Sequence, residues 1–255
     1  MKVTPALFPK PLPSLKLLLT GATVGPLVDS FHNQCLLEYN RNVIDVPTPS
    51  FLLAMSDSNI QESTSYILRS STYIPPLLAI AYLILGGVLP RMISSIVEKS
   101  EMTETNESSK SASLRNKAIL AVSTTALIIK LSELLETSAI MDNPNVNLLI
   151  MLSAALTQWA VLDGTLVSFI TASIVSIGGP LSELPFVAYG FWTYLPEASD
   201  YFPLQNVDLD NISIAKQMLG EDYRNLALSS ITGPCYFAVT MDAIALGRYF
   251  DEETE

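Results

Sequence analysis

The sequence is poor in the residues that build most soluble catalytic and metal sites. Among 255 residues there is one histidine, His32, and there are two cysteines, Cys35 and Cys235. A single histidine excludes most histidine-based metal sites and triads, and two distant cysteines provide neither a disulfide framework nor the spacing of a metal site. We therefore predict no catalytic residues, no metal and no cofactor, and expect that the protein is not an enzyme.

Charged residues are also scarce, and most of them are acidic. They make up 15% of the chain, whereas 49% of the residues are hydrophobic; average soluble proteins carry about 25% charged residues. The net charge of −11 comes mainly from loops and from the tail Asp251–Glu255. Because no basic patch is present to neutralise phosphates, the composition argues against binding to nucleic acid.

The chain is instead rich in long uncharged segments. The clearest runs from Asn143 to Ser182 and carries one charge, Asp163, near its middle. Each half is about as long as a helix needs to cross a hydrocarbon core of roughly 30 Å. Neither half has the polar face of a soluble amphipathic helix. The stretch therefore predicts two membrane spans joined by a tight turn at Asp163-Gly164.

Similar apolar segments follow one another along the chain, with no soluble module between them. We predict an all-α fold, a bundle of six transmembrane helices over residues 15–250, after an irregular arm (1–14) and before an acidic tail (251–255). The predicted spans cover residues 15–31, 66–89, 118–135, 145–162, 164–195 and 225–250. Residues 33–65, 90–117 and 197–224 are predicted loops, of which 90–117 is polar enough to be disordered.

The first apolar segment has two interpretations. It is short enough to be the core of a signal peptide, which would be cleaved. It contains Gly21, Gly25 and Pro26, however, and it lacks a clear small-x-small cleavage site. These features favour a retained span, and the spacing Gly21-x-x-x-Gly25 predicts close packing against another helix.

Lysine and arginine are divided unevenly between the two predicted sides of the bundle. Cytoplasmic loops carry the excess of these residues in membrane proteins. The side of the amino terminus collects Lys2, Lys10, Lys16, Arg91, Lys99, Lys110, Arg115, Lys117 and Arg248, and the other side Arg41, Lys216 and Arg224. We therefore predict that both termini and Asp163 face the cytoplasm.

Two pairs of polar residues fall inside or beside the predicted spans, where burial of a charge in lipid costs at least about 2–3 kcal/mol. Lys130 and Glu133 share one helical face, so they either neutralise each other or contact a ligand or another helix. Asp29 and His32 also share a face. They either anchor the end of the first span or form a carboxylate–histidine pair able to act as a general base.

Proline and glycine interrupt three spans, at Pro75-Pro76, Gly178-Gly179-Pro180 and Gly233-Pro234. Because a proline removes a backbone donor, we expect a break near residues 179–180 in the fifth span. Broken helices in lipid have their backbone groups satisfied by other protein groups or at a cavity. The interruptions are therefore either packing kinks or the walls of an internal lipid pocket.

Asp163 also has two interpretations. A carboxylate in this turn could cap the fifth span, because the N-terminal end of a helix dipole favours negative charge. An exposed acid on the cytoplasmic face could instead mark the place where a partner docks.

Five short segments match, in order, the motifs of one family of membrane proteins. Leu36-Leu37 with Arg41-Asn42-Val43 resembles LLxxxRNV, Tyr73–Pro76 resembles WWVPP, and Gly86–Pro90 lies where the family has GLLYP. Trp159–Asp163 is similar to WWTFD. The last span, with Pro234-Cys235, Phe237-Ala238, Thr240-Met241 and Gly247-Arg248, resembles PCIFFAGGITMGNIGR with a one-residue gap. On these motifs the chain resembles the Insig family over residues 15–250.

The resemblance implies a non-enzymatic regulator of sterol homeostasis in the endoplasmic reticulum membrane. Such a protein binds an oxysterol and docks onto sterol-sensing membrane proteins, namely a transcription-factor escort protein and HMG-CoA reductase. Bacterial relatives bind diacylglycerol-like lipids, so either lipid is an expected ligand. Asp163 matches the family's docking acid and Trp159 lies in the same motif, so we predict that both bind the partner. The predicted ligand-binding residues are Gly25, Pro75, Pro76, Gly179, Pro180, Pro234 and Cys235. Homo-oligomerisation stays open.

The chain departs from the family pattern mainly where partners would dock. Family tryptophans are replaced by Ala160, Tyr73 and Ile74, and the basic residues after the turn acid by Gly164, Thr165 and Leu166. These departures affect the choice of partner more than the fold.

Three alternatives to a sterol-linked regulator therefore remain. The first is a glycerolipid-binding membrane protein with no sterol role. The second is a small transporter subunit, in which Lys130, Glu133 and Asp242 would converge on a midplane site; the lack of a detectable internal repeat argues against it. The third is a membrane enzyme that uses Asp29 and His32.

Overall fold

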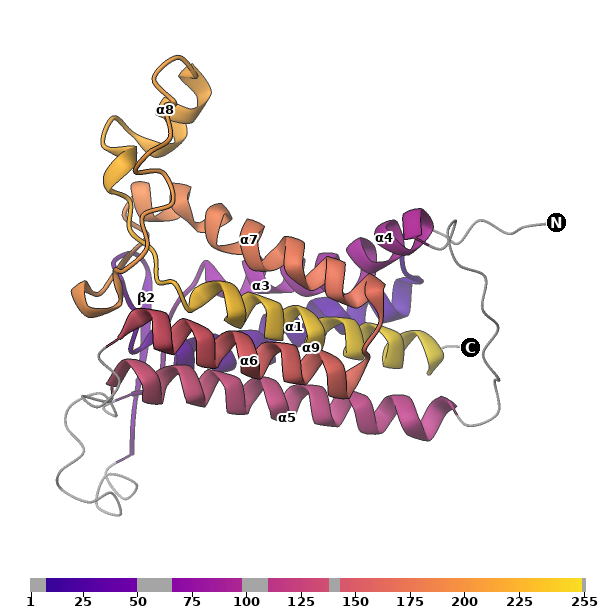
Figure 1. Cartoon of the computed structure of the whole chain (residues 1–255). Coiled ribbons are helices and arrows are strands. Elements are labelled where there is room, and N and C mark those ends of the chain that lie inside the picture. The colour runs from indigo at the N-terminus through magenta and orange to yellow at the C-terminus, as the bar shows by residue number, and fades with distance from the viewer. Residues whose placement is uncertain (1–7, 50–65, 98–109, 138–142, 254–255) are drawn as a thin grey trace.

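Long helices lie side by side and form a bundle (Figure 1). The structure, a computed structural model, describes residues 8–49, 66–97, 110–137 and 143–253, with the backbone alone for residues 110–113. The bundle consists of α1 (Pro11–Asn33), α3 (Ile74–Tyr82) continued by the π-helical η1 (Leu83–Val88) and by α4 (Leu89–Val97), α5 (Lys110–Thr137), α6 (Pro144–Leu162), α7 (Leu166–Ala188) and α9 (Thr232–Glu252).

The outer faces of the helices carry large apolar side chains. Leu19 on α1, Leu127 on α5, Leu149 on α6 and Ile177 on α7 are all more than half exposed. In the described part of the chain, four stretches are long and apolar enough to cross a membrane: Ile74–Val97, Leu114–Thr137, Pro144–Leu162 and Leu166–Ala188. Apolar surface along the length of a bundle is typical of contact with lipid. The chain is therefore a multi-pass membrane protein.

α9 runs through the middle of the bundle, where it contacts α1, α5, α6, α7 and η1 (Figure 1). Its side chains are mostly buried, among them Ala238, Met241 and Ile244. Because protein rather than lipid surrounds α9, the helix also accommodates the buried polar residues Thr240 and Asp242. This central position explains why α9 is less apolar than α6 and α7.

Glycines bring neighbouring helices into close contact at two places. A Cβ atom at Gly21 would overlap the backbone of α3 at Leu78, and one at Gly25 would lie 3.0 Å from Leu78 Cδ1. The close packing predicted from the Gly21-x-x-x-Gly25 spacing is thus confirmed, with α3 as the partner. Gly86 in η1 and Gly247 in α9 likewise face each other, and a Cβ at either would meet backbone of the other element.

The start of α1, the Asp163-Gly164 turn and the end of α9 lie at one end of the bundle, which we call the terminal end (Figure 1). Three ion pairs join the elements here. Lys16 pairs with Glu253 at 2.5 Å, Arg91 pairs with Asp251, and Arg248 pairs with Asp163 at 2.5 Å. The terminal end therefore ties the first and second helical segments, and the α6–α7 turn, to the last helix.

The opposite end, which we call the strand end, carries short strands, so the fold is not purely α-helical as predicted. β1 (Leu37–Tyr39) pairs with β4 (Trp192–Tyr194), and β2 (Val43–Pro47) pairs with β3 (Tyr66–Ser71), both antiparallel. β3 occupies the residues expected to begin the second span. As a strand it places Arg69 3.6 Å from both Glu38 and Asp45, whereas a helix there would carry the guanidinium towards lipid.

Two of the predicted interruptions are helix starts. Pro75 and Pro76 lie in the first turn of α3, and Pro234 lies in the first turn of α9. Proline is tolerated there because the first N–H groups of a helix have no partner within the helix. The second and sixth helical segments accordingly begin at Ile74 and Thr232, later than predicted.

The break predicted near residues 179–180 is absent, because α7 continues through Pro180 to Ala188. A Cβ at Gly179 would lie 2.5 Å from the Tyr236 ring of α9. The glycine therefore lets the two helices approach, which is the packing interpretation rather than a break. The fifth segment ends before residue 195, as Gly190 at φ +66° turns the chain into β4.

Other predicted boundaries shift by a few residues. The arm predicted over 1–14 ends at Pro11, where α1 begins, and residues 1–7 lie outside the described residues. The loop predicted over 90–117 includes most of α4 and the start of α5, and its centre, 98–109, is also outside them. Of the predicted tail, Asp251 and Glu252 belong to α9, and residues 254–255 are not described.

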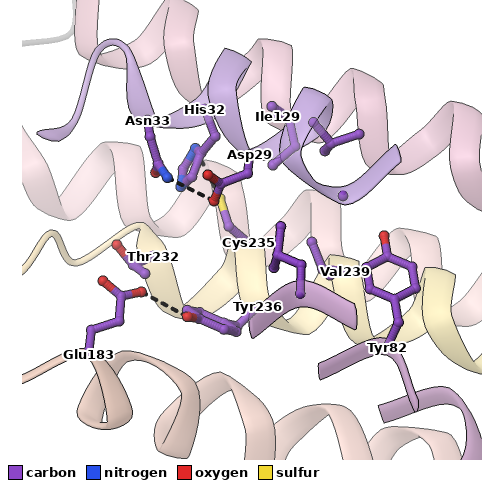
Figure 2. A pocket seen from close by; sticks show the side chains of 13 residues that line it. Asp29, His32, Asn33, Tyr82, Ile129, Glu183, Thr232, Cys235, Tyr236 and Val239 are labelled. Carbon is purple, nitrogen blue, oxygen red and sulfur yellow. Dashed lines mark hydrogen bonds between the residues drawn. The ribbon is translucent and has the colours of Figure 1, made fainter. Parts of the chain in front are cut away.

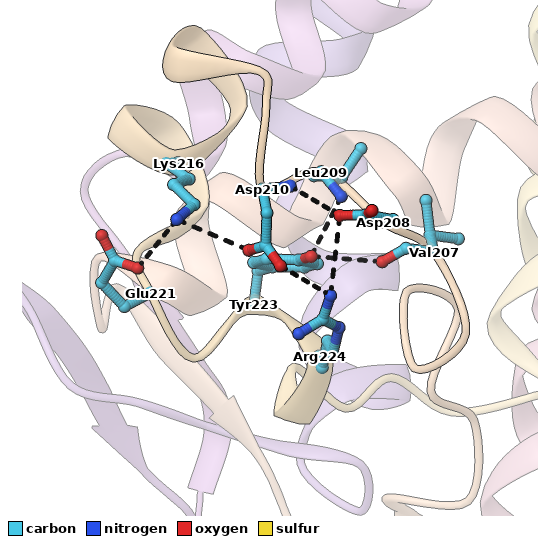
Figure 3. A network of polar contacts seen from close by, with 8 residues as sticks. All are labelled: Val207, Asp208, Leu209, Asp210, Lys216, Glu221, Tyr223 and Arg224. Carbon is cyan, nitrogen blue, oxygen red and sulfur yellow. Dashed lines mark hydrogen bonds and ion pairs between the residues drawn. The ribbon is translucent and has the colours of Figure 1, made fainter.

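The acidic loop over 197–224 is ordered by its own ion pairs (Figure 3). It contains α8 (Ser213–Leu219), whose Lys216 lies 3.2 Å from Glu221 and 3.5 Å from Asp210. Arg224 lies 3.0 Å from Asp210, and the Tyr223 hydroxyl accepts a hydrogen bond from the Leu209 N–H at 3.0 Å. The acids of this loop therefore serve largely to hold it together.

The glycine contact between η1 and α9 predicts a stability difference between two alanine substitutions. Gly247→Ala should destabilise the protein by about 1–3 kcal/mol, because the added methyl meets the Gly86 backbone. Gly178→Ala, where nothing lies within 4 Å, should leave stability unchanged or raise it by about 0.5–1 kcal/mol. Thermal unfolding of both variants in one detergent tests this; equal melting temperatures would contradict it.

Candidate functional site

A cavity of about 90 Å³ opens inside the bundle between α1, α3, α5, α7 and α9 (Figure 2). Apolar side chains form much of its wall, and the polar side chains come from α1, α3, α7 and α9. Its lining consists of Gly25, Val28, Asp29, His32, Asn33, Leu78, Tyr82, Ile129, Glu183, Thr232, Cys235, Tyr236 and Val239.

One wall of the cavity presents the Asp29 carboxylate from α1. Asn33 Nδ2 donates a hydrogen bond to Oδ1 at 2.8 Å, and the Tyr39 hydroxyl donates to Oδ2 at 2.7 Å. Asn33 also donates to the Tyr39 hydroxyl at 2.8 Å. Because Tyr39 lies in β1, the strand end holds the orientation of this carboxylate, and both of its hydrogen-bond donors are neutral.

The opposite wall presents the Glu183 carboxylate from α7 (Figure 2). The Tyr236 hydroxyl donates to Oε1 at 2.9 Å, and the Tyr194 hydroxyl donates to Oε2 at 2.7 Å. Tyr194 lies in β4, so here too a strand and a helix hold one carboxylate. Neither Asp29 nor Glu183 has a basic partner within 4 Å among the described residues.

His32 lies beside Asp29, but its ring is bound elsewhere. Nδ1 lies 2.9 Å from Ser132 Oγ and 3.9 Å from Cys235 Sγ. The Ser132 hydroxyl itself donates to the Ile129 carbonyl at 2.7 Å. The Asp29 carboxylate is bonded to Asn33 and Tyr39 instead of to the His32 ring. The carboxylate–histidine pair of the general-base interpretation is therefore not formed.

An apolar groove of about 350 Å³ adjoins the cavity between α1 and α5. Its lining consists of Val28, Phe31, Ala126, Ile129, Lys130 and Glu133. Val28 and Ile129 line the cavity as well, so they form a wall common to both spaces. At the groove, Lys130 Nζ donates to both Glu133 carboxylate oxygens at 2.8 Å, which confirms that these two charges neutralise each other.

The predicted ligand-binding residues divide into two groups. Gly25 and Cys235 line the cavity. Pro75, Pro76 and Pro234 form first helical turns, and Gly179 packs against Tyr236, the side chain that does line it. Pro180 lines a separate space beside Ser229 and Ser230. Sequence reasoning missed Glu183, although a lone acid in a predicted span was a usable signal.

Asp163 and Trp159, the predicted docking residues, both build the α6–α7 turn. Asp163 accepts hydrogen bonds from Arg248 at 2.5 Å and from the Thr165 hydroxyl at 2.6 Å, and its side chain is only 8% exposed. Trp159 Nε1 donates to the Thr165 carbonyl at 3.0 Å. Gly164, at φ +64°, makes the turn tight.

Asp163 does not cap α7, in contrast to one prediction. α7 begins at Leu166, and the Thr165 side chain accepts the N–H of Ser168 as its N-cap. Burial opposes ionisation of Asp163, but the Arg248 guanidinium and the hydroxyl hydrogen bonds outweigh burial and hold its pKa below the ordinary value of 3.8. Asp163 is therefore ionised, and its ion pair with Arg248 joins the α6–α7 turn to α9. We call this ion pair the clasp.

The three residues of the transporter alternative do not converge. Lys130 and Glu133 pair with each other on α5 beside the groove. Asp242 is buried in α9 and accepts a hydrogen bond from the Tyr82 hydroxyl at 2.9 Å.

The clasp predicts a coupling between Asp163 and Arg248. In a double-mutant cycle of Asp163→Asn and Arg248→Gln, unfolding should give an interaction energy of about 1 kcal/mol or more. Arg224→Gln, which breaks the exposed pair with Asp210, should cost no more than about 0.5 kcal/mol.

The same clasp predicts a pH dependence. Because the folded-state pKa of Asp163 is lowered, its ionisation stabilises the fold fully above pH 3.8, and this stability is lost as pH falls through the lowered value. The gap in unfolding free energy between the wild type and Asp163→Asn should close at acidic pH. A gap that is constant with pH would contradict the assignment.

No protein-family model and no curated protein sequence matches this chain. Two solved structures resemble it, the Insig homologue MvINS from Mycobacterium vanbaalenii and a cross-linked trimer of MvINS. Each has a TM-score of 0.55 and 14% sequence identity, and the match covers 95% of both chains. A likeness of this extent over nearly the whole length shows that the chain has an Insig-like fold.

Proposed function

We propose that this protein is a non-enzymatic membrane regulator that binds a lipid inside its helical bundle. The observation that carries the proposal is the cavity with two polar walls, set in an Insig-like fold and sharing the lining residues Val28 and Ile129 with an apolar groove. Ligand sites of this kind combine apolar surface with a few convergent polar groups.

The dimensions of the two spaces suit the two parts of an amphipathic lipid. The cavity of about 90 Å³ takes a small polar group, and the groove of about 350 Å³ takes an apolar body. The carboxylates of Asp29 and Glu183 accept hydrogen bonds, and oxysterols and diacylglycerols carry hydroxyl donors. An oxysterol or a diacylglycerol-like lipid is therefore the proposed ligand.

Binding would act on the bundle through α1, α5, α7 and α9, which all contribute to the cavity wall. A lipid that fits one arrangement of these helices better than another shifts the population towards that arrangement. This shift would control docking onto a membrane partner. By the family resemblance, the partners are sterol-sensing membrane proteins, an escort protein and HMG-CoA reductase, in the endoplasmic reticulum.

The terminal end is the proposed cytoplasmic and docking face. Lys16, Arg91, Lys117 and Arg248 belong to the helix ends that meet there, in line with the excess of basic residues on cytoplasmic sides. Trp159 and Asp163 lie in the turn at this end. Because Arg248 already pairs with Asp163, a partner would recognise the shape of the turn as well as its charge.

Lipid binding is tested by competition in nanodiscs with labelled 25-hydroxycholesterol, unlabelled cholesterol and diacylglycerol. We expect saturable binding; displacement by diacylglycerol alone would favour the glycerolipid alternative. Ile129→Trp, at the common wall, should weaken binding at least about tenfold by filling the site, whereas Leu127→Trp on the exposed face of α5 should not.

A photoreactive lipid gives a second measurement that does not depend on a substitution. Its cross-links should map to α1, α5 and α9 around Val28, Ile129 and Val239. Cross-links confined to outer faces, or no saturable binding of any of these lipids, would overturn the proposed function.

Docking through the turn is tested by two variants that break the same clasp. If the Asp163 carboxylate contacts the partner, Asp163→Ala should abolish co-purification of a sterol-sensing-domain protein. Arg248→Gln frees that carboxylate and should preserve or strengthen co-purification. Equal losses in both variants would instead assign Asp163 a structural role, and normal binding by Asp163→Ala would remove it from docking.

A further inference from the structure

The lysine, arginine and carboxylate census of the cavity lining is one-sided, because both of its charged side chains are acidic. Two carboxylates, Asp29 and Glu183, face it from α1 and α7, and its lining contains no lysine or arginine (Figure 2). Both side chains are half-buried. An acid without a counter-charge within a membrane span is costly and marks a functional site by default.

Each carboxylate also keeps free accepting capacity. Asp29 and Glu183 each receive one neutral donor per oxygen, from Asn33 and Tyr39 and from Tyr236 and Tyr194 respectively. An ionised carboxylate offers about four lone-pair positions. The protein therefore orients both groups with neutral donors and leaves lone pairs on both sides of the cavity.

We propose that the cavity receives the primary ammonium group of a single-chain amphiphile, whose N–H donors meet Asp29 and Glu183. This assignment rests on the proposed lipid-binding role of the cavity, and it names a long-chain amine as a ligand in place of the oxysterol or the diacylglycerol-like lipid. A primary ammonium group offers three donors and one positive charge. It thus satisfies both carboxylates and supplies the missing counter-charge together.

The groove determines the remainder of the ligand. Val28 and Ile129 separate the cavity from the apolar space beside Phe31 and Ala126, so a chain attached to the ammonium group would pass between these two side chains. The lining of the cavity has no cation that could hold a phosphate, and two carboxylates would repel one. The geometry therefore favours a long-chain amine, such as a sphingoid base, over an aminophospholipid.

The proposal is tested with matched ligands in phosphatidylcholine nanodiscs. Octadecylamine, octadecanol and an octadecyl trimethylammonium salt share one chain and differ in charge and in donors. Octadecylamine should displace a photoreactive long-chain amine at least about tenfold more effectively than either of the others. Cross-links of the photoreactive amine should map to α1, α7 and α9 around the cavity.

Two conservative variants and one control locate the site. Glu183→Gln and Asp29→Asn should each weaken octadecylamine binding at least about tenfold, since a hydrogen bond to a charged group contributes about 1.5–3 kcal/mol. Melting temperatures close to that of the wild type would show that both variants are folded. Glu197→Gln removes the same charge from an exposed loop at the strand end and should leave octadecylamine binding unchanged.

The outcomes separate this proposal from the proposed function. If diacylglycerol or octadecanol binds saturably while octadecylamine shows no advantage, the ammonium assignment fails and the lipid-binding role stands. Amine binding that is insensitive to both cavity variants also overturns the assignment. If none of these ligands binds saturably, both proposals fail.

Discussion

The packing of α9 against five neighbouring elements is the contact on which the rest of the structure depends. Membrane helices gain little from the hydrophobic effect once they are in lipid, so close approach and internal hydrogen bonds hold them together. Gly247 against Gly86 brings the backbones of α9 and η1 together, and Gly179 makes room on α7 for Tyr236. The Tyr236 side chain then reaches Glu183 on α7 and forms one wall of the cavity. The same helix that organises the bundle thus also positions the candidate site.

The strand end completes that site in a way that a simple helical bundle could not. β1 and β4 pair with each other at this end of the bundle. The Tyr39 hydroxyl of β1 and the Tyr194 hydroxyl of β4 each donate a hydrogen bond to a carboxylate in the cavity. The strands therefore fix the orientation of Asp29 and Glu183, while α1 and α7 fix their separation. At the terminal end, Arg248 and Asp163 hold the helices together by charge instead. The proposed ligand site and the proposed docking face therefore lie towards opposite ends of one bundle.

Much of this fold was predictable because helices that contact lipid need apolar side chains. The outer helices α5, α6 and α7 must be apolar where they meet the bilayer, and hydropathy located them and the turn at Asp163. Hydropathy did not separate β3 from the start of α3, because Ile67 and Leu68 lie close before the apolar helix, although Arg69 and two serines stand between them and α3. Prolines were ambiguous for a similar reason, since Pro75 is costly inside a helix and harmless in its first turn. The site was less predictable. The sequence singled out the pair Asp29 and His32, and separately Cys235, but contacts such as His32 with Ser132, or Glu183 with Tyr236, join distant segments and follow only from the packing.

The thin wall between groove and cavity has a consequence for how a ligand would be sensed. Val28 and Ile129 are shared by both spaces, and Phe31, which lines the groove, is about half exposed on the outer surface of the bundle. A ligand arriving by this path comes from the bilayer and never crosses water. The occupancy of the cavity then depends on the mole fraction of that lipid in the bilayer. The protein would therefore respond to membrane composition and not to the low concentration of the lipid dissolved in the cytosol.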